Sequence, residues 1–308
     1  MNSIRVAQWL LSNGDSRSSA TGFLGAVGTD EAGQLLFDLA GRAGLQARLE
    51  RVSSKPTGIC AALITGQNRT LVTRLGAALH FSDAHLASEP CQSLVNQARM
   101  LYIGGFFFSS NPGAIARLVK LEGPLIAMNL HATFLCENFA NPELLSRIDL
   151  LFGNEREALT LARHLADCGD AELAKLPLDC GQKNSMISDD LLLQLAGIIV
   201  GRLRQSRRPR VVFTHGAKPL AFAAGGSGGP VGHPVPTVEP ARVRDTNGCG
   251  DAFVGGFLAG AVQQLSDPAC VRLGQYAAEV VIEQDGCSLP DWEPRPPPSS
   301  QLDLPLGS

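Results

Sequence analysis

The sequence predicts an α/β fold in which a mostly parallel sheet is covered by helices on both faces. Short apolar runs alternate with segments of helical periodicity along most of the chain, and helix-capping residues stand in many of the turns between them. A glycine-rich turn at Gly248–Gly250 then opens an apolar helix. Strands that alternate with helices favour parallel pairing, because each helix returns the chain to the same edge of the sheet.

The first quarter of the chain shows this alternation and then departs from it. Apolar residues at helical spacing run from Ile4 to Leu11, residues 21–27 resemble a buried strand, and Gly28-Thr29-Asp30 caps a helix that ends near Ala43. Strand-like runs follow at 46–52, 57–65 and 69–75, with turn residues between them. We therefore expect a small β lid at residues 45–75, with a β-excursion that only packs as the equal alternative.

The rest of the chain resumes the alternation. Strands are expected at 100–105, 125–129, 148–152, 210–214 and 220–224, and helices after Asn111-Pro112, Asn141-Pro142, Gly153-Asn154-Glu155 and Asp267-Pro268 and near 189–203. We expect residues 1–44 and 76–291 to form one large α/β domain. Gly and Pro mark residues 225–236 as a flexible loop, and the Pro-rich residues 292–308 as a disordered tail.

The composition excludes several classes of protein. The 29 acidic and 26 basic residues give a net charge of -3 without long runs, which offers no electrostatic case for nucleic acid or an anionic membrane. The eight cysteines show no C-x-x-C pair and no zinc-finger spacing, and we find no secretory signal and no apolar run of membrane-spanning length. We expect a monomer with reduced thiols in the cytoplasm, with the nucleus as the alternative compartment.

The turn before the apolar helix at Asp251 has the features of a phosphate site. Backbone N–H groups at a helix start lack partners inside the helix, and the helix dipole makes that end electropositive. Asp251 would repel an anion there unless it has separate work, such as taking a proton from an attacking hydroxyl. The alternative makes it an ordinary first-turn residue stabilised by the dipole. No P-loop and no dinucleotide fingerprint is present in the sequence.

Two further groups of residues are candidates for ligand contacts. Asn154 and Glu157 lie at i and i+3 of a predicted helix start, a spacing that suits holding Mg²⁺ through water and equally suits a capped helix. Phe106, Phe107 and Phe108 follow a predicted strand and suit a base-binding pocket, although such residues more often belong to the core.

The stretch Asp245–Phe253 resembles the C-terminal signature of the ribokinase-type sugar and nucleoside kinases. Other stretches, collinear across nearly the whole chain, narrow the resemblance to the adenosine kinases of that family: 2–9, 56–58, 66–69, 102–107, 151–155 and 285–287. The resemblance implies a ribokinase-like three-layer α/β/α Rossmann-like sheet with a small β lid. It implies ATP-dependent phosphorylation of the 5′-hydroxyl of adenosine to AMP, in purine salvage, with Mg²⁺. The alternative is a kinase for another nucleoside or a sugar.

The resemblance also implies roles for particular residues. Asp251 would be the general base, the amides of Gly248, Cys249 and Gly250 the anion hole, and Arg69 the lid arginine that approaches the γ-phosphate. Residues implied to bind adenosine are Asn2, Leu71, Leu75 and Phe107. Residues implied on the ATP side are Asn154, Thr214, Gly216, Asn247 and Gln275. Glu157 with Asn154 would hold Mg²⁺ through water.

The sequence departs from the family pattern at a few places. Cys249 stands where the family usually has Ala, and Gln275 where close relatives often have His. The family's first strand, the ribose-binding aspartate after it and part of the lid find no counterpart in the sequence. We therefore expect weak adenosine binding by the chain as given, and a binding protein that keeps the fold without turnover is the third reading.

Overall fold

The computed structural model describes the chain except residues 13–18, 66–67, 180–186, 227, 292 and 298–308, and at 64–65 and 68–71 it describes the backbone. Contacts divide the chain into two compact units. The first unit comprises Met1–Gln97, Ser109–Ala114 and the described chain from Pro240 onward, and the second comprises Ala98–Phe108 and Ile115–Glu239. These bounds differ from the predicted large domain and lid.

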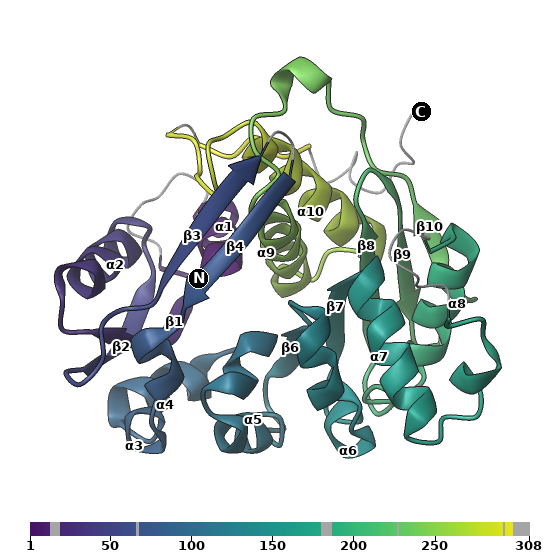
Figure 1. Cartoon of the computed structure of the whole chain (residues 1–308), viewed down its shortest axis with the longest axis horizontal. Coiled ribbons are helices and arrows are strands. Elements are labelled where there is room, and N and C mark those ends of the chain that lie inside the picture. Colours follow the sequence, from purple (N-terminus) through teal and green to yellow (C-terminus); the bar gives the residue numbers. More distant parts are fainter. Residues whose placement is uncertain (13–18, 66–67, 180–186, 227, 292, 298–308) are drawn as a thin grey trace. The chain divides into compact units, whose positions relative to one another are not determined.

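A six-stranded sheet forms the centre of the second unit, in the order β10-β9-β8-β7-β6-β5 (Figure 1). Its parallel strands are β5 (Met100–Gly104), β6 (Leu125–Asn129), β7 (Leu150–Asn154) and β8 (Arg210–His215). β9 (Lys218–Ala224) and β10 (Val231–His233) are antiparallel. The segment 225–236 is therefore not entirely a loop, because its residues 231–233 pair with β9 and so satisfy their backbone groups.

Helices pack on this sheet and close the core of the second unit. They are η2 (Gly105–Ser109), α5 (Pro112–Leu118), η3 (Thr133–Phe139), α6 (Pro142–Leu145), α7 (Glu155–Asp167), η4 (Leu173–Lys175) and α8 (Asp189–Val200). The apolar faces of α7 and α8 join buried strand residues such as Ile126 and Phe213 in one cluster. Burial of this apolar surface provides the main driving force for folding the unit.

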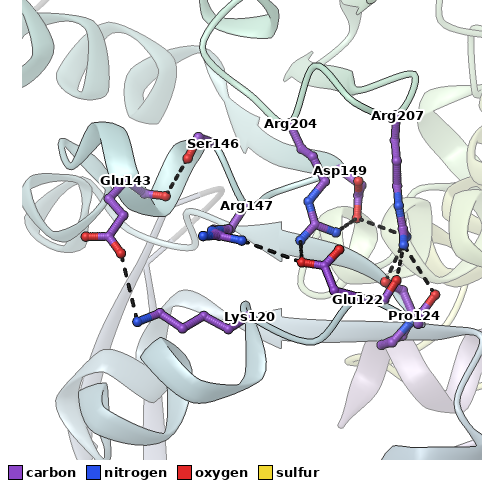
Figure 2. A network of polar contacts seen from close by, with 10 residues as sticks. Lys120, Glu122, Pro124, Glu143, Ser146, Arg147, Asp149, Arg204 and Arg207 are labelled. Carbon is purple, nitrogen blue, oxygen red and sulfur yellow. Dashed lines mark hydrogen bonds and ion pairs between the residues drawn. The ribbon is translucent and has the colours of Figure 1, made fainter.

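A network of charged residues lies where the loops enter β6, β7 and β8 (Figure 2). Asp149 is 2% exposed, and its Oδ2 accepts the N–H of Ile126 at 2.8 Å. The guanidinium of Arg204, 5% exposed, lies 3.6 Å from the same oxygen, and that of Arg207 lies 3.8 Å from it. Burial raises the pKa of Asp149 more than the guanidinium groups lower it. The network ties together the loops at this edge of the sheet.

The first unit contains two small sheets and a helical layer. β1 (Gly22–Gly28) pairs in parallel with β2 (Gln46–Val52), and α2 (Glu31–Arg42) connects them as in other β-α-β units. β3 (Ile59–Thr65) and β4 (Asn68–Arg74) form a separate antiparallel hairpin. The residues of the predicted lid therefore do not form one sheet: β2 pairs with β1, and the hairpin stands apart. β1 is also outside the six-stranded sheet.

The first unit has further helices besides α2. They are α1 (Asn2–Leu11), η1 (Gly76–His80), α3 (Asp83–Leu86), α4 (Glu89–Gln97), η5 (Pro240–Arg242), α9 (Cys249–Val262) and α10 (Asp267–Ile282). A side chain at Gly256 of α9 would meet the carbonyl oxygen of Leu273 in α10 at 2.4 Å. Glycine therefore lets the two helix backbones touch.

The structure bears only in part on the predicted C-terminal tail and on membrane-spanning segments. Of the predicted disordered tail, residue 292 and residues 298–308 lie outside the described residues; the described part forms neither helix nor strand, and the N–H of Arg295 donates to the hydroxyl of Tyr276 at 2.8 Å. Among the described helices, none has the length and apolar character that crossing a membrane requires.

Candidate active site

Asp245 organises the turn that precedes α9. Its Oδ1 accepts the backbone N–H of Asn247 at 2.8 Å, and its Oδ2 accepts the Asn247 side-chain amide at 3.1 Å. The same Oδ2 accepts the N–H of Gly286 at 3.2 Å. One carboxylate thus ties the turn to the loop after α10. Asn247, predicted to contact ATP, uses its side chain here to hold the turn.

The geometry of the turn requires glycine at position 248 but not at position 250. Gly248 caps α9 with φ +82°, a left-handed conformation that favours glycine, and a side-chain carbon there would lie 2.5 Å from Cβ of Cys287. At Gly250 such a carbon would meet nothing within 4 Å. The turn is therefore packed behind Gly248 and open at Gly250.

The backbone amides of this turn stand at the start of α9. The N–H of Cys249 makes a long 3.4 Å hydrogen bond to the carbonyl of Thr246. The N–H groups of Gly250 and Asp251 belong to the first turn of α9, where a helix offers no internal acceptor. Together with the positive end of the helix dipole, these donors suit an anion.

Asp251 lies in the same turn, and two side chains of α1 contact its carboxylate. The hydroxyl of Ser3 donates to Oδ1 at 2.9 Å, and the amide of Asn2 donates to Oδ2 at 3.2 Å. Each carboxylate oxygen has a second lone pair that remains able to accept a proton. Ser3 was not among the predicted site residues, although it directly follows the predicted Asn2 in α1. The structure therefore brings residues from both ends of the sequence together at Asp251.

Other predicted residues of the first unit are placed less directly. The backbones of Arg69 and Leu71 pair with Ile64 and Ala62 in the hairpin, and the side chains of Arg69 and Leu71 lie outside the described residues. Leu75 follows the hairpin and is half-buried. Gln275 is 5% exposed in α10, which leaves little of its surface for a ligand. Their roles stay predictions.

Asn154 and Glu157 form a reciprocal cap at the start of α7. Oδ1 of Asn154 accepts the N–H of Glu157 at 2.9 Å, and Oε2 of Glu157 accepts the N–H of Asn154 at 3.0 Å. The Asn154 amide donates to the other Glu157 oxygen at 2.7 Å. This is the capping box of helix starts. Burial raises the pKa of Glu157, and the hydrogen bonds from Asn154 oppose that shift.

The same contacts decide how a metal ion would fit. Each oxygen of Glu157 accepts one hydrogen bond from Asn154 and keeps a second lone pair, so the pair suits Mg²⁺ held through water. The described part of the chain holds no group of three or more His, Cys, Asp or Glu that could cage a metal. Mg²⁺ commonly keeps several waters and takes the rest of its ligands from phosphates, so this arrangement is compatible with the ion.

The sheet gathers three predicted residues of the ATP side at the carboxyl ends of its strands. Asn154 of β7 is paired with Thr214 of β8, and the Thr214 hydroxyl lies 3.5 Å from the carbonyl oxygen of Gly153. Gly216 follows in the exposed β8–β9 turn with φ +60°. The carboxyl ends of strands are where open α/β sheets bind their ligands.

Aromatic residues collect at the ends of β5 and β6 in the same unit. Phe107, predicted to line the pocket, is half-buried against the core. Phe106 and Phe134, exposed at 46% and 71%, have ring centroids 6.1 Å apart. The ring of His131 stacks on Phe106 at 5.5 Å. Sequence reasoning missed Phe134 and His131, although both closely follow a predicted strand.

Comparisons with known proteins find similarity to kinases over almost the whole chain. The family model described as pfkB family carbohydrate kinase matches residues 1–294. Adenosine kinase 2 of Arabidopsis thaliana is 33% identical over 301 residues, which cover 94% of this chain and 79% of that protein. Adenosine kinase of Dictyostelium discoideum is 32% identical over 300 residues, covering 96% of this chain and 81% of that protein.

Solved structures give the same result in three dimensions. Anopheles gambiae adenosine kinase in complex with P1,P4-di(adenosine-5) tetraphosphate matches with a TM-score of 0.80 and 32% identity, covering 94% of this chain and 81% of that one. Schistosoma mansoni adenosine kinase in complex with adenosine and AMP matches with a TM-score of 0.73 and 26% identity, covering 94% and 80%. The predicted ribokinase-like α/β fold is confirmed, and the structure shows it as a central mixed sheet with small separate sheets.

Proposed function

Because this chain belongs to the pfkB family of carbohydrate kinases, we propose that it transfers the γ-phosphoryl group of ATP to the 5′-hydroxyl of adenosine and so forms AMP. The adenosine kinases that resemble it over 94% of its length support the choice of nucleoside. The observation that carries the proposal is the position of Asp251, a carboxylate in the first turn of α9 directly after the glycine turn Gly248–Gly250.

Asp251 acts as the general base in this proposal. A substrate hydroxyl between the carboxylate and the phosphate gives its proton to Asp251 while its oxygen bonds to the γ-phosphorus. The bond from that phosphorus to the bridging oxygen breaks, and ADP leaves. The amides of Gly248, Cys249 and Gly250, at the positive end of α9, stabilise the negative charge on the transferred group.

The remaining predicted residues have proposed roles in binding. When bound, Mg²⁺ neutralises charge on the phosphates, and Asn154 and Glu157 hold its waters. We assign adenosine contacts to Asn2, Leu71, Leu75 and Phe107, ATP contacts to Thr214, Gly216, Asn247 and Gln275, and a γ-phosphate contact to Arg69.

Phosphorylation of a panel of nucleosides and sugars with Mg·ATP tests the proposal. We expect product with adenosine in preference to the other acceptors, and a loss of kcat of about 100-fold or more in Asp251→Asn, in line with the usual contribution of a general base. Asp38→Asn is the matched control, since Asp38 is an exposed carboxylate of the same unit. Preference for a sugar, or turnover that survives in Asp251→Asn, would contradict the proposal.

The role of Glu157 has a separate test. In Glu157→Gln we expect a higher Mg²⁺ concentration at half-maximal rate, because one formal charge near the metal's waters is lost. Glu155→Gln is the control, since Glu155 lies in the same helix turn but outside the capping box. Equal Mg²⁺ titrations of wild type and Glu157→Gln would refute the metal role.

A further inference from the structure

Ser3 is a buried residue whose hydroxyl contacts Asp251, and it is not among the residues assigned to substrate binding. It is 2% exposed, and its hydroxyl donates to Oδ1 of Asp251 at 2.9 Å. A hydrogen bond to an ionised carboxylate is stronger than one between neutral groups. The first turn of α1 thus supplies a buried hydrogen-bond donor to one oxygen of the proposed base.

The packing of α1 on α9 fixes the position of this hydroxyl. Gly255 lies one helical turn after Asp251 and therefore on the same face of α9. A side-chain carbon at Gly255 would lie 2.4 Å from the carbonyl oxygen of Ser3 and 2.7 Å from Cβ of Val6. The backbone of α1 rests directly on this glycine, so Ser3 has little freedom to move away from Asp251.

The second donor to Asp251 is held less firmly. The amide of Asn2 lies 3.2 Å from Oδ2, a longer hydrogen bond than that of Ser3, and Asn2 is only half-buried. Of the two carboxylate oxygens, Oδ1 therefore has the short, buried donor and Oδ2 has the donor that a ligand can displace more easily.

We propose that Ser3 is a positioning residue: it holds Oδ1 of Asp251 so that Oδ2 is the oxygen that accepts the proton of the substrate hydroxyl. This inference rests on the proposed function. In the reaction, the substrate hydroxyl replaces the Asn2 amide at Oδ2 and transfers its proton there. Its oxygen forms the bond to the γ-phosphorus, and the bond between that phosphorus and ADP breaks. Asn2 is then released to bind the nucleoside.

The kinetic constants of variants test these separate roles of Ser3 and Asn2. In Ser3→Ala we expect kcat to fall about tenfold or more, the effect of losing one hydrogen bond to a charged group, with KM for adenosine within about twofold of wild type. Ser3→Thr keeps the hydroxyl and is expected to retain kcat within about threefold. Asn2→Ala is expected to raise KM for adenosine, because its amide serves the nucleoside.

Ser12→Ala is the matched control, since Ser12 also lies at an end of α1 but donates to the carbonyl of Trp9 at 3.0 Å. We expect wild-type kcat in this variant. Unchanged kcat in Ser3→Ala would overturn the inference and leave the proposed function in place. Equal losses in Ser3→Ala and Ser3→Thr, or in Ser12→Ala, would also overturn it, because they indicate disturbed helix packing. A wild-type protein that phosphorylates no adenosine would instead contradict the proposed function itself.

Discussion

The carbonyl oxygen of Ser3 lies against Gly255, where an added side-chain carbon would be only 2.4 Å away. Backbone atoms of two helices meet at this point, and neither can give way as the end of a flexible side chain would. The contact holds α1 against α9 and so places both donors of α1 on Asp251. A change at Gly255 is therefore expected to reach the site through helix packing.

Gly255→Ala should lower both stability and kcat. The added methyl group forces α1 away from α9, and overpacking of this kind usually costs about 1–3 kcal/mol. Gly41→Ala is the control, because Gly41 lies in α2 and a side chain there would meet nothing within 4 Å. That substitution should stabilise the helix by up to about 1 kcal/mol. Thermal unfolding and initial-rate kinetics of the two variants measure the difference, and equal stabilities would contradict the packing argument.

Gly248→Ala should abolish most activity. It should also lower the free energy of unfolding by more than the left-handed φ of this residue alone explains. A left-handed residue other than glycine costs about 1–2 kcal/mol, and here the methyl group also meets Cβ of Cys287. Gly169→Ala provides the comparison, since Gly169 has φ +99° but open space around it. Denaturant unfolding should show a greater loss for Gly248→Ala. Adding Cys287→Gly should restore part of that loss, and no restoration would refute the steric cause.

The thiol of Cys287 should react slowly with alkylating agents at neutral pH. Burial, followed by the charge of Asp251, raises its pKa to about 11. Because the thiolate is the nucleophile, the alkylation rate should increase with pH and still be rising at about pH 9. Mass spectrometry after iodoacetamide treatment measures this, with the exposed Cys60 as the fast-reacting reference. Asp251→Asn should make Cys287 react faster, and equal rates at Cys60 and Cys287 at neutral pH would contradict the prediction.

Asp149→Ala should strongly destabilise the protein. It removes the nearer of two carboxylates that pair with Arg204, which is 5% exposed, and leaves the more distant and exposed Glu122 at 4.0 Å (Figure 2). Breaking a buried pair in this way usually costs about 3–5 kcal/mol. Glu143→Ala removes one partner of the exposed Lys120–Glu143 pair, 3.9 Å apart in the same network, and should cost at most about 1 kcal/mol. Urea unfolding of both variants measures the loss in free energy of unfolding, and comparable losses would refute the argument.

The features that depended on neighbouring residues could be predicted from the sequence. The glycine turn, the cap formed by Asn154 and Glu157 and the alternation of strands and helices all follow from short-range spacing. The family resemblance then supplied the fold, which the comparisons confirm. For the capping box, the structure confirms the helix interpretation, since Oε2 of Glu157 accepts the N–H of Asn154, and the metal role stays a prediction.

The sequence by itself determined the order of the elements and the chemistry of the turn before α9, because hydrogen-bonded turns and helix starts are built by residues close together in the chain. Only the tertiary structure decided that β2 pairs with β1, that Asp245 reaches Gly286, and that Ser3 bonds to Asp251. Ser3 and Asp251 are 248 residues apart, and no local pattern encodes their contact. It exists because a glycine without a side chain lets two helix backbones approach.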